Sequence, residues 1–139
     1  MNNQRGFSLI EIMVVVVILG ILASIVVPKI ISRPDEARVV KAKQDVLAIQ
    51  NAMDLYKLDN GVYPSTDQGL MALVEKPTSN PIPRDWKAYL KSLPRDPWGR
   101  EYLYLNPGQH GDIDIFTLGA DGQPGGTGIN AEIGNWDAK

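Results

Sequence analysis

Apolar residues follow two different patterns in the first half of the chain. Residues Ile12–Val27 read IMVVVVILGILASIVV, which is apolar on every side of a helix. Counted from Phe7, this stretch reaches the ~20 residues that a membrane-spanning helix requires. From Asp35 to about Asp59 the apolar residues recur at alternating steps of three and four, which predicts an amphipathic helix packed on the chain's own domain. Its apolar stripe comprises Val39, Ala42, Val46, Ile49, Met53 and Tyr56.

Two prolines interrupt this long helical region. Pro28 lacks an amide donor and should kink the helix. Pro34 is either a second interruption or part of the first turn of a new helix that Ser32 caps. The pattern leaves one bent helix and two separate helices both open, and Asn60–Gly61 is the expected stop.

The remainder of the chain predicts a small α+β domain. Residues Thr66–Val74 predict a short second helix that Ser65 or Thr66 caps. Tyr102–Leu105 predicts one strand and Asp112–Leu118 another. The residues expected to face inward on the second strand are Ile113, Ile115 and either Phe116 or Leu118. We therefore expect a small antiparallel sheet packed against the stripe of the helix.

Glu11 is the only ionisable side chain between Phe7 and Val27. Three interpretations of the segment compete: a cleaved secretory signal, a plain membrane anchor, and an anchor that also serves as an assembly helix. A carboxylate inside a transmembrane segment costs about 2.5–3.5 kcal/mol on insertion scales, so Glu11 favours the third interpretation, in which it meets a cationic partner. The alternative is that Glu11 lies at the helix start, reaches the membrane interface and interacts with the helix dipole.

Residues 5–11, Arg-Gly-Phe-Ser-Leu-Ile-Glu, precede the apolar run and resemble the class III signal of type IV pilins and their relatives. This resemblance implies that a prepilin peptidase cuts after Gly6 and N-methylates the new first residue, Phe7. It also implies that Glu11 pairs with the free amine of Phe7 on a neighbouring subunit. Such a pair would remove the cost of an isolated carboxylate and set the register between subunits.

Three further segments are similar to the major pseudopilins of type II secretion systems. They are residues 59–70, the Asp-Pro-Trp-Gly sequence at 96–99 and the Gly-Asn-Trp sequence at 134–136. The resemblance implies a type IV pilin-like α+β fold, with a long amino-terminal helix packed on a small antiparallel sheet. It also divides the chain into a leader at 1–6, a transmembrane and assembly helix at 7–28, and a periplasmic domain at 29–139.

The function that this resemblance implies is structural. The chain would be the main subunit of a pseudopilus, a periplasmic filament that is assembled from inner-membrane subunits and helps to drive folded proteins across the outer membrane. The implied partners are further copies of the chain, minor pseudopilins, prepilin peptidase, the inner-membrane assembly platform and, before assembly, membrane lipid. The alternatives are a subunit of a surface type IV pilus and a membrane-anchored periplasmic binding module.

The glycine-rich segment Gly119–Gly134 has no periodic apolar pattern, so it is either a flexible loop or a loop that an ion orders. Calcium takes six to eight oxygen ligands from carboxylates, amides and backbone carbonyls, all of which this segment can supply. The resemblance to major pseudopilins implies a calcium site here, although their acidic pair before Ile-Gly-Asn-Trp is altered to Asn130-Ala131-Glu132. The implied side-chain ligands are Asp121, Asn130 and Glu132, with backbone ligands near Leu118 and Gln123.

The composition excludes several classes of function. Fourteen basic and 16 acidic residues give a formal net charge of −2, which argues against a nucleic-acid partner. The absence of cysteine excludes disulfides, thiol nucleophiles and cysteine-type zinc sites. The one histidine, His110, lies in a predicted turn with no recognisable serine or aspartate partner. We therefore expect a protein that is not an enzyme.

Overall fold

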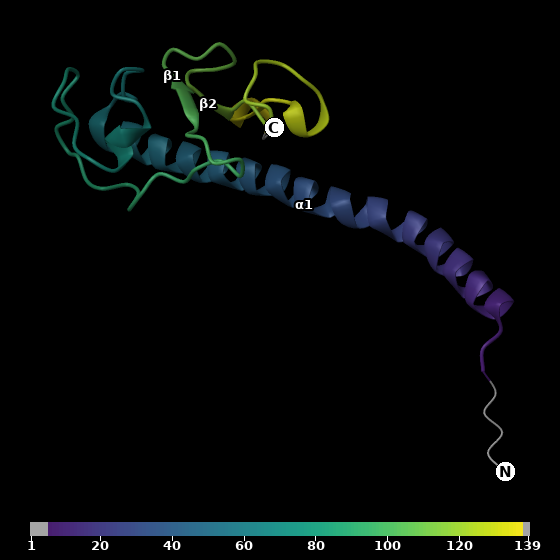
Figure 1. Cartoon of the computed structure of the whole chain (residues 1–139). Helices are drawn as coiled ribbons and strands as arrows, with labels where there is room; N and C mark the ends of the chain where they lie inside the picture. Colours follow the sequence, from purple (N-terminus) through teal and green to yellow (C-terminus); the bar gives the residue numbers. More distant parts are fainter. Residues whose placement is uncertain (1–5, 138–139) are drawn as a thin grey trace. The chain divides into compact units, whose positions relative to one another are not determined.

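The computed structural model describes residues 6–137, except that the side chains of residues 26–32 lie outside the description. The contacts divide the chain into two units, Met1–Glu36 and Ala37–Lys139. In chain order the elements are α1 (Leu9–Asn60), the 3-10 helix η1 (Leu70–Leu73), β1 (Leu103–Leu105), β2 (Asp114–Thr117), η2 (Gly128–Asn130), β3 (Ile133–Gly134) and η3 (Asn135–Asp137) (Figure 1).

Helix α1 is one element from Leu9 to Asn60, which decides between the one-helix and two-helix interpretations. The kink predicted at Pro28 falls among residues 26–32, outside the fully described part of the chain, and stays a prediction. The predicted stop is confirmed, because the Gly61 amide donates to the Lys57 carbonyl at 2.7 Å and Gly61 has a φ of +83°.

The unit Ala37–Lys139 has its own hydrophobic core. The predicted helix stripe supplies one side of it, since Ala42, Val46, Ile49, Met53 and Tyr56 are all buried. Val39 is only half-buried, and the stripe gains Ala52, which the periodicity did not include. Tyr102, Tyr104, Ile113 and Ile115 from the sheet region, together with Leu70, Ala72 and Leu73, complete the core cluster.

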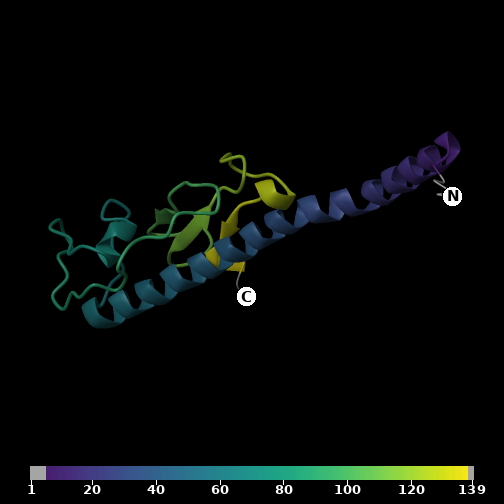
Figure 2. The same cartoon turned by 60° about the horizontal axis from the view of Figure 1, so that its bottom comes forward.

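The sheet is antiparallel in the order β1-β2-β3 and lies along the carboxy-terminal half of α1 (Figure 2). Tyr104 pairs with Ile115, and Phe116 pairs with Gly134. Ile113 and Ile115 are buried as predicted, but Phe116 and Leu118 are only half-buried and Thr117 is buried instead. The strands are three, four and two residues long, so β3 is too short to leave a periodic signal in the sequence.

The predicted second helix over Thr66–Val74 is wrong in extent. Only the single 3-10 turn η1 forms, because Gly69 precedes it with a φ of +64°, which breaks the helical path. The hydrogen bonds expected of a cap at Ser65 form, but they close a turn at residues 65–68 and cap no helix, since the N-cap of η1 is Gly69. The Ser65 amide donates to Gln68 Oε1 at 3.0 Å, and the Gln68 amide donates to Ser65 Oγ at 3.2 Å.

Candidate functional site

The start of α1 holds the residues predicted to control processing and assembly. Gly6, Phe7 and Ser8 precede the helix and are exposed, whereas residues 1–5 of the predicted leader lie outside the described residues. The Ser8 amide donates to Glu11 Oε2 at 3.3 Å, and the Glu11 amide donates to Ser8 Oγ at 3.3 Å. In the isolated subunit Glu11 therefore closes a capping box at the helix start, while its carboxylate stays exposed.

The apolar segment behind Glu11 buries almost nothing within its own subunit. Its large apolar side chains from Phe7 to Ile25 are between 48% and 81% exposed. Exposed apolar surface of this extent is unusual on a soluble monomer. No helix among the described residues is long and apolar enough to cross a bilayer.

The glycine-rich segment forms a closed loop between β2 and β3. The Ala120 amide donates to the Ile129 carbonyl at 2.9 Å, which joins the two ends of the loop. Gly119, with a φ of +86°, has no room for a side chain, since a Cβ atom there would lie 2.7 Å from the Ala131 carbonyl oxygen. The tight backbone therefore explains the glycine at this position.

Two carboxylates bind the backbone of this loop. Asp121 Oδ1 accepts from the Gln123 amide at 3.1 Å, and Glu132 Oε1 accepts from the Gly125 amide at 3.4 Å. Asp121 and Gln123 are exposed, whereas the other three predicted ligands, Leu118, Asn130 and Glu132, are half-buried.

The donor chemistry of the loop fits a hard divalent cation, because its carboxylate, carboxamide and carbonyl groups all offer oxygen. Among the described residues, no three histidine, cysteine, aspartate or glutamate side chains gather at one point. A cation in this loop would therefore depend on the Asn130 amide and on backbone carbonyls, in addition to the carboxylates of Asp121 and Glu132.

His110 has an aspartate partner that the sequence did not reveal. Its Nδ1 lies 2.9 Å from Oδ2 of the buried Asp114, and its ring stacks on Trp136 with centroids 3.8 Å apart. Burial opposes ionisation of Asp114, but hydrogen bonds from the His110 ring and from the Gln109 and His110 amides outweigh it and lower the pKa of Asp114. Because Asp114 also accepts from the Gln109 and His110 amides, the pair holds the turn that precedes β2.

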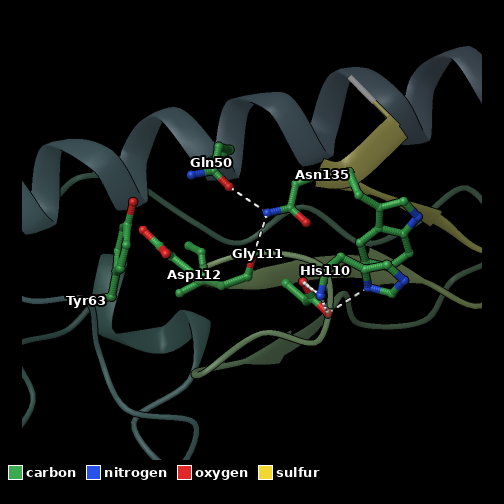
Figure 3. A pocket seen from close by; sticks show the side chains of 9 residues that line it. Gln50, Tyr63, His110, Gly111, Asp112 and Asn135 are labelled. Carbon is green, nitrogen blue, oxygen red and sulfur yellow. Dashed lines mark hydrogen bonds and ion pairs between the residues drawn. The ribbon is translucent and has the colours of Figure 1, made fainter. Parts of the chain in front are cut away.

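A cavity of about 210 Å³ lies beside this pair (Figure 3). Asn135, which follows β3 directly, lines it and joins helix to sheet. Its Nδ2 donates to Gln50 Oε1 and to the Ile113 carbonyl, both at 2.8 Å, and its Oδ1 accepts from the Ile115 amide at 3.1 Å. The side chain of Asn135 thus continues the hydrogen bonding of β2 where β3 ends. In the sequence, the Gly-Asn-Trp segment at 134–136 stood out only for its resemblance to pseudopilins and not for this structural role.

Comparison with known proteins identifies the family. The model of "Type II secretion system (T2SS), protein G" matches residues 29–136, and that of "Prokaryotic N-terminal methylation motif" matches residues 1–27. This chain belongs to the type II secretion system protein G family.

Curated members of the protein G family cover nearly the whole chain. A type II secretion system core protein G of Pseudomonas aeruginosa is 62% identical over 98% of this chain and 97% of its own length. That of Vibrio cholerae is 60% identical over 99% of this chain and 94% of its own. Among solved structures, the major pseudopilin of the type 2 secretion system of enterohaemorrhagic Escherichia coli superposes with a TM-score of 0.70 at 47% identity, covering 78% of this chain and 90% of that one.

Membership of the protein G family confirms three predictions from the sequence. The resemblance to type II secretion pseudopilins is confirmed, as is the pilin-like α+β fold with a long helix on a small antiparallel sheet. The prediction of a pseudopilus subunit is also confirmed, and with it a place among structural components of secretion. The cleavage site, the pairing of Glu11 and the calcium ligands stay predictions.

Proposed function

We propose that this chain is the major repeating subunit of a pseudopilus, anchored in the inner membrane before assembly and with its domain 29–139 in the periplasm. The observation that carries the proposal is the ordered amino-terminal helix, whose apolar side chains are at least about half exposed from Phe7 to Ile25. Lipid covers this surface before assembly and neighbouring subunits cover it afterwards, since water would leave it unfavourably exposed. The subunit has a structural rather than a catalytic role.

Processing prepares the subunit for assembly. Prepilin peptidase cuts between Gly6 and Phe7 and methylates the Phe7 amine, which becomes the positively charged terminus of the mature chain. Within the subunit Glu11 already accepts the Ser8 amide, but a hydrogen bond to one amide leaves its negative charge unpaired. The Phe7 amine of a neighbour supplies the opposite charge and fixes the register of the two helices.

The decisive experiment separates helix capping from assembly. Glu11→Gln keeps the shape and the acceptor oxygen that cap Ser8, but removes the charge. Ser8→Ala removes the Ser8 hydroxyl that caps Glu11 and keeps the charge. We expect Glu11→Gln to abolish cross-linkable filaments while Ser8→Ala assembles normally, with unchanged urea unfolding of the domain in both. Equal assembly of Glu11→Gln and the unmodified chain would refute the pairing mechanism.

Partners and location have tests of their own. Mass spectrometry of the mature chain should find an N-methylated Phe7 as the first residue, and a chain cut near Ala23 would instead indicate a secretory signal. Cross-linking from the membrane fraction should recover further copies of the chain, minor pseudopilins and the assembly platform. Recovery in the soluble fraction before assembly would contradict the membrane anchor.

We further propose that calcium orders the carboxy-terminal loop, held by Asp121 and Glu132, with Asn130 and the carbonyls of Leu118 and Gln123 as additional ligands. Support comes from the oxygen-only donor set and from the two carboxylates that already bind loop amides at Gln123 and Gly125. A calcium ion bound only to the folded loop would stabilise the domain by mass action, about 2.7 kcal/mol at 100 times the dissociation constant.

Thermal unfolding of the full chain in detergent tests this proposal. Saturating calcium should raise the midpoint by roughly 10–20 °C over the value in chelator, which follows from about 2.7 kcal/mol in a domain of about 100 residues. Asp121→Asn and Glu132→Gln should remove most of that rise. Asp112→Asn is the matched control, because it removes an exposed carboxylate outside the loop. An identical midpoint with calcium and with chelator would eliminate the ion.

A further inference from the structure

Arg100 lies at the base of the glycine-rich loop and points its charge into it. Its Nη1 donates to the Gly119 carbonyl at 2.9 Å, and its Nη2 donates to the Ala120 carbonyl at 3.2 Å. Among the described residues no carboxylate pairs with this guanidinium. Its positive charge is therefore bound by carbonyl oxygens of the loop rather than by an acid.

Gly122 leaves the space that the guanidinium occupies. A Cβ atom at this position would lie 2.6 Å from Cζ of Arg100 and 2.7 Å from its Nε. Gly125 makes a useful comparison, because it also has a positive φ, +79° against +65° at Gly122, yet a Cβ atom there would meet nothing within 4 Å. Gly119 and Gly126 are also crowded, but by Ile129, Asn130 and Ala131, whereas the atoms that crowd Gly122 belong to the side chain of Arg100.

A buried carboxylate fixes both Arg100 and the start of the loop. Asp96, which is 4% exposed, accepts from the Arg100 amide at 2.8 Å through Oδ1 and from the Thr117 hydroxyl at 2.6 Å through Oδ2. Thr117 Oγ1 in turn accepts from the Gly119 amide at 3.4 Å. The backbone of Arg100 and the residue whose carbonyl it binds are therefore held by one anchor.

We propose that Arg100 is a positioning residue, an internal cation that binds the carbonyls at the base of the loop 119–131 and holds the loop closed before any ion arrives. A consequence, which rests on the calcium proposal, is that Arg100 strengthens calcium binding by reducing the ordering that the ion must bring about. Each carbonyl oxygen has two lone pairs. The Gly119 carbonyl accepts from both Arg100 and the Gly122 amide, the latter at 3.3 Å, so of these two carbonyls only that of Ala120 keeps a lone pair beside its bond to Arg100.

Charge repulsion works in the opposite direction, since a guanidinium near a divalent cation weakens its binding. The loop is largely exposed, however, and water and salt screen such a repulsion strongly. The closure of the loop depends directly on the bonds that Arg100 supports, above all the one from the Ala120 amide to Ile129. We therefore expect loss of the arginine to weaken calcium binding, and the sign of the change decides between the two effects.

The test compares Arg100→Gln and Arg100→Lys with Arg95→Gln in the full chain in detergent. Arg95 is a matched control, because it lies on the same turn and donates to the Gly99 carbonyl rather than to the loop. In chelator, amide hydrogen exchange of residues 118–131 should be about tenfold faster in Arg100→Gln than in the unmodified chain or Arg95→Gln. Titration with calcium chloride should give a roughly tenfold higher dissociation constant, with Arg100→Lys in between because it keeps the charge without the fork of donors.

A second pair of variants tests the same contact with the arginine retained. Gly122→Ala displaces the guanidinium and should open the loop as Arg100→Gln does, whereas Gly125→Ala carries similar backbone strain without the clash and should open it much less. Unchanged exchange in Arg100→Gln, or equal effects of the two alanines, would refute the positioning role. Tighter calcium binding by Arg100→Gln would refute the consequence for the ion. If the unmodified chain binds no calcium, the calcium proposal fails, and the exchange measurement in chelator still decides the role of Arg100.

Discussion

Replacing Asn135 by alanine should be among the most damaging single changes at the surface of the domain. Asn135 is only half-buried, yet its side chain makes three hydrogen bonds, to Gln50, Ile113 and Ile115. Two of these satisfy backbone groups of buried residues, since Ile113 is 3% exposed and Ile115 fully buried. The third joins the sheet to α1 across 85 positions of sequence.

The structure sets the size of the effect. A buried backbone group left without a partner costs about 1–3 kcal/mol, so two of them cost about 2–6 kcal/mol. The neighbouring cavity of about 210 Å³ lets water reach part of the vacated space, which places the expected loss near the lower half of that range, at about 3 kcal/mol. For a domain of about 100 residues this corresponds to a fall in the thermal midpoint of about 12–24 °C.

Urea unfolding of the full chain in detergent, followed by tryptophan fluorescence, measures this loss directly. Asn51→Ala is the matched control, because Asn51 is exposed on the same helix as Gln50 and its replacement should change stability by less than about 0.5 kcal/mol. Asn135→Asp keeps the acceptor for Ile115 but removes both donors, so it should also destabilise. If Asn135→Ala unfolds within about 0.5 kcal/mol of the unmodified chain, the hydrogen bonds do not join helix and sheet as argued.

Three further predictions concern pH and packing. The pKa of Asp114 is lowered in the folded chain. Its contribution to the free energy of unfolding is therefore complete above the ordinary aspartate pKa of ~4 and is lost as the pH falls through the lower folded value. The urea midpoint of Asp114→Asn should accordingly vary less with pH over that acid range than the midpoint of the unmodified chain. Burial and a hydrogen bond to a carboxylate raise the pKa of Tyr63 and of Tyr89 to about 12. The free energy of unfolding should therefore fall as the pH rises from ~10 towards 12, and part of the tyrosinate absorbance should appear only above pH ~10. Titration of all five tyrosines near pH ~10 would contradict this prediction. Leu73 is fully buried, so Leu73→Ala should lower the free energy of unfolding in urea by about 2–5 kcal/mol. Met71 lies in the same turn but is 46% exposed, so Met71→Ala should lower it far less. Similar losses in the two variants would mean that η1 is not part of the core.

The amino-terminal half of the chain was largely predictable because its information is local. The step of three and four residues that runs from Ala42 to Tyr56 places the buried face of α1 directly, and Asn60–Gly61 marks its end. The acid at Glu11, four residues after Phe7, carries the assembly hypothesis in the same way. The local pattern left Ala52 out of the buried face, and it overestimated the second helix, where Gly69 limits η1 to one turn.

The sheet and the carboxy-terminal loop depend on contacts between distant residues, and these only the tertiary structure decided. The alternating pattern revealed β1 and β2, but β3 has only two residues and leaves no periodic signal. Nothing local indicates that Asp96 and Thr117, 21 positions apart, share a buried hydrogen bond. The same holds for Arg100, which finds the carbonyls of Gly119 and Ala120 about 20 positions away. The sequence by itself determined the helix, its processing signal and the family, because each depends on a pattern of neighbouring residues. The tertiary structure decided which polar groups are buried, because a polar side chain can leave water only where the fold brings it a hydrogen-bonding partner.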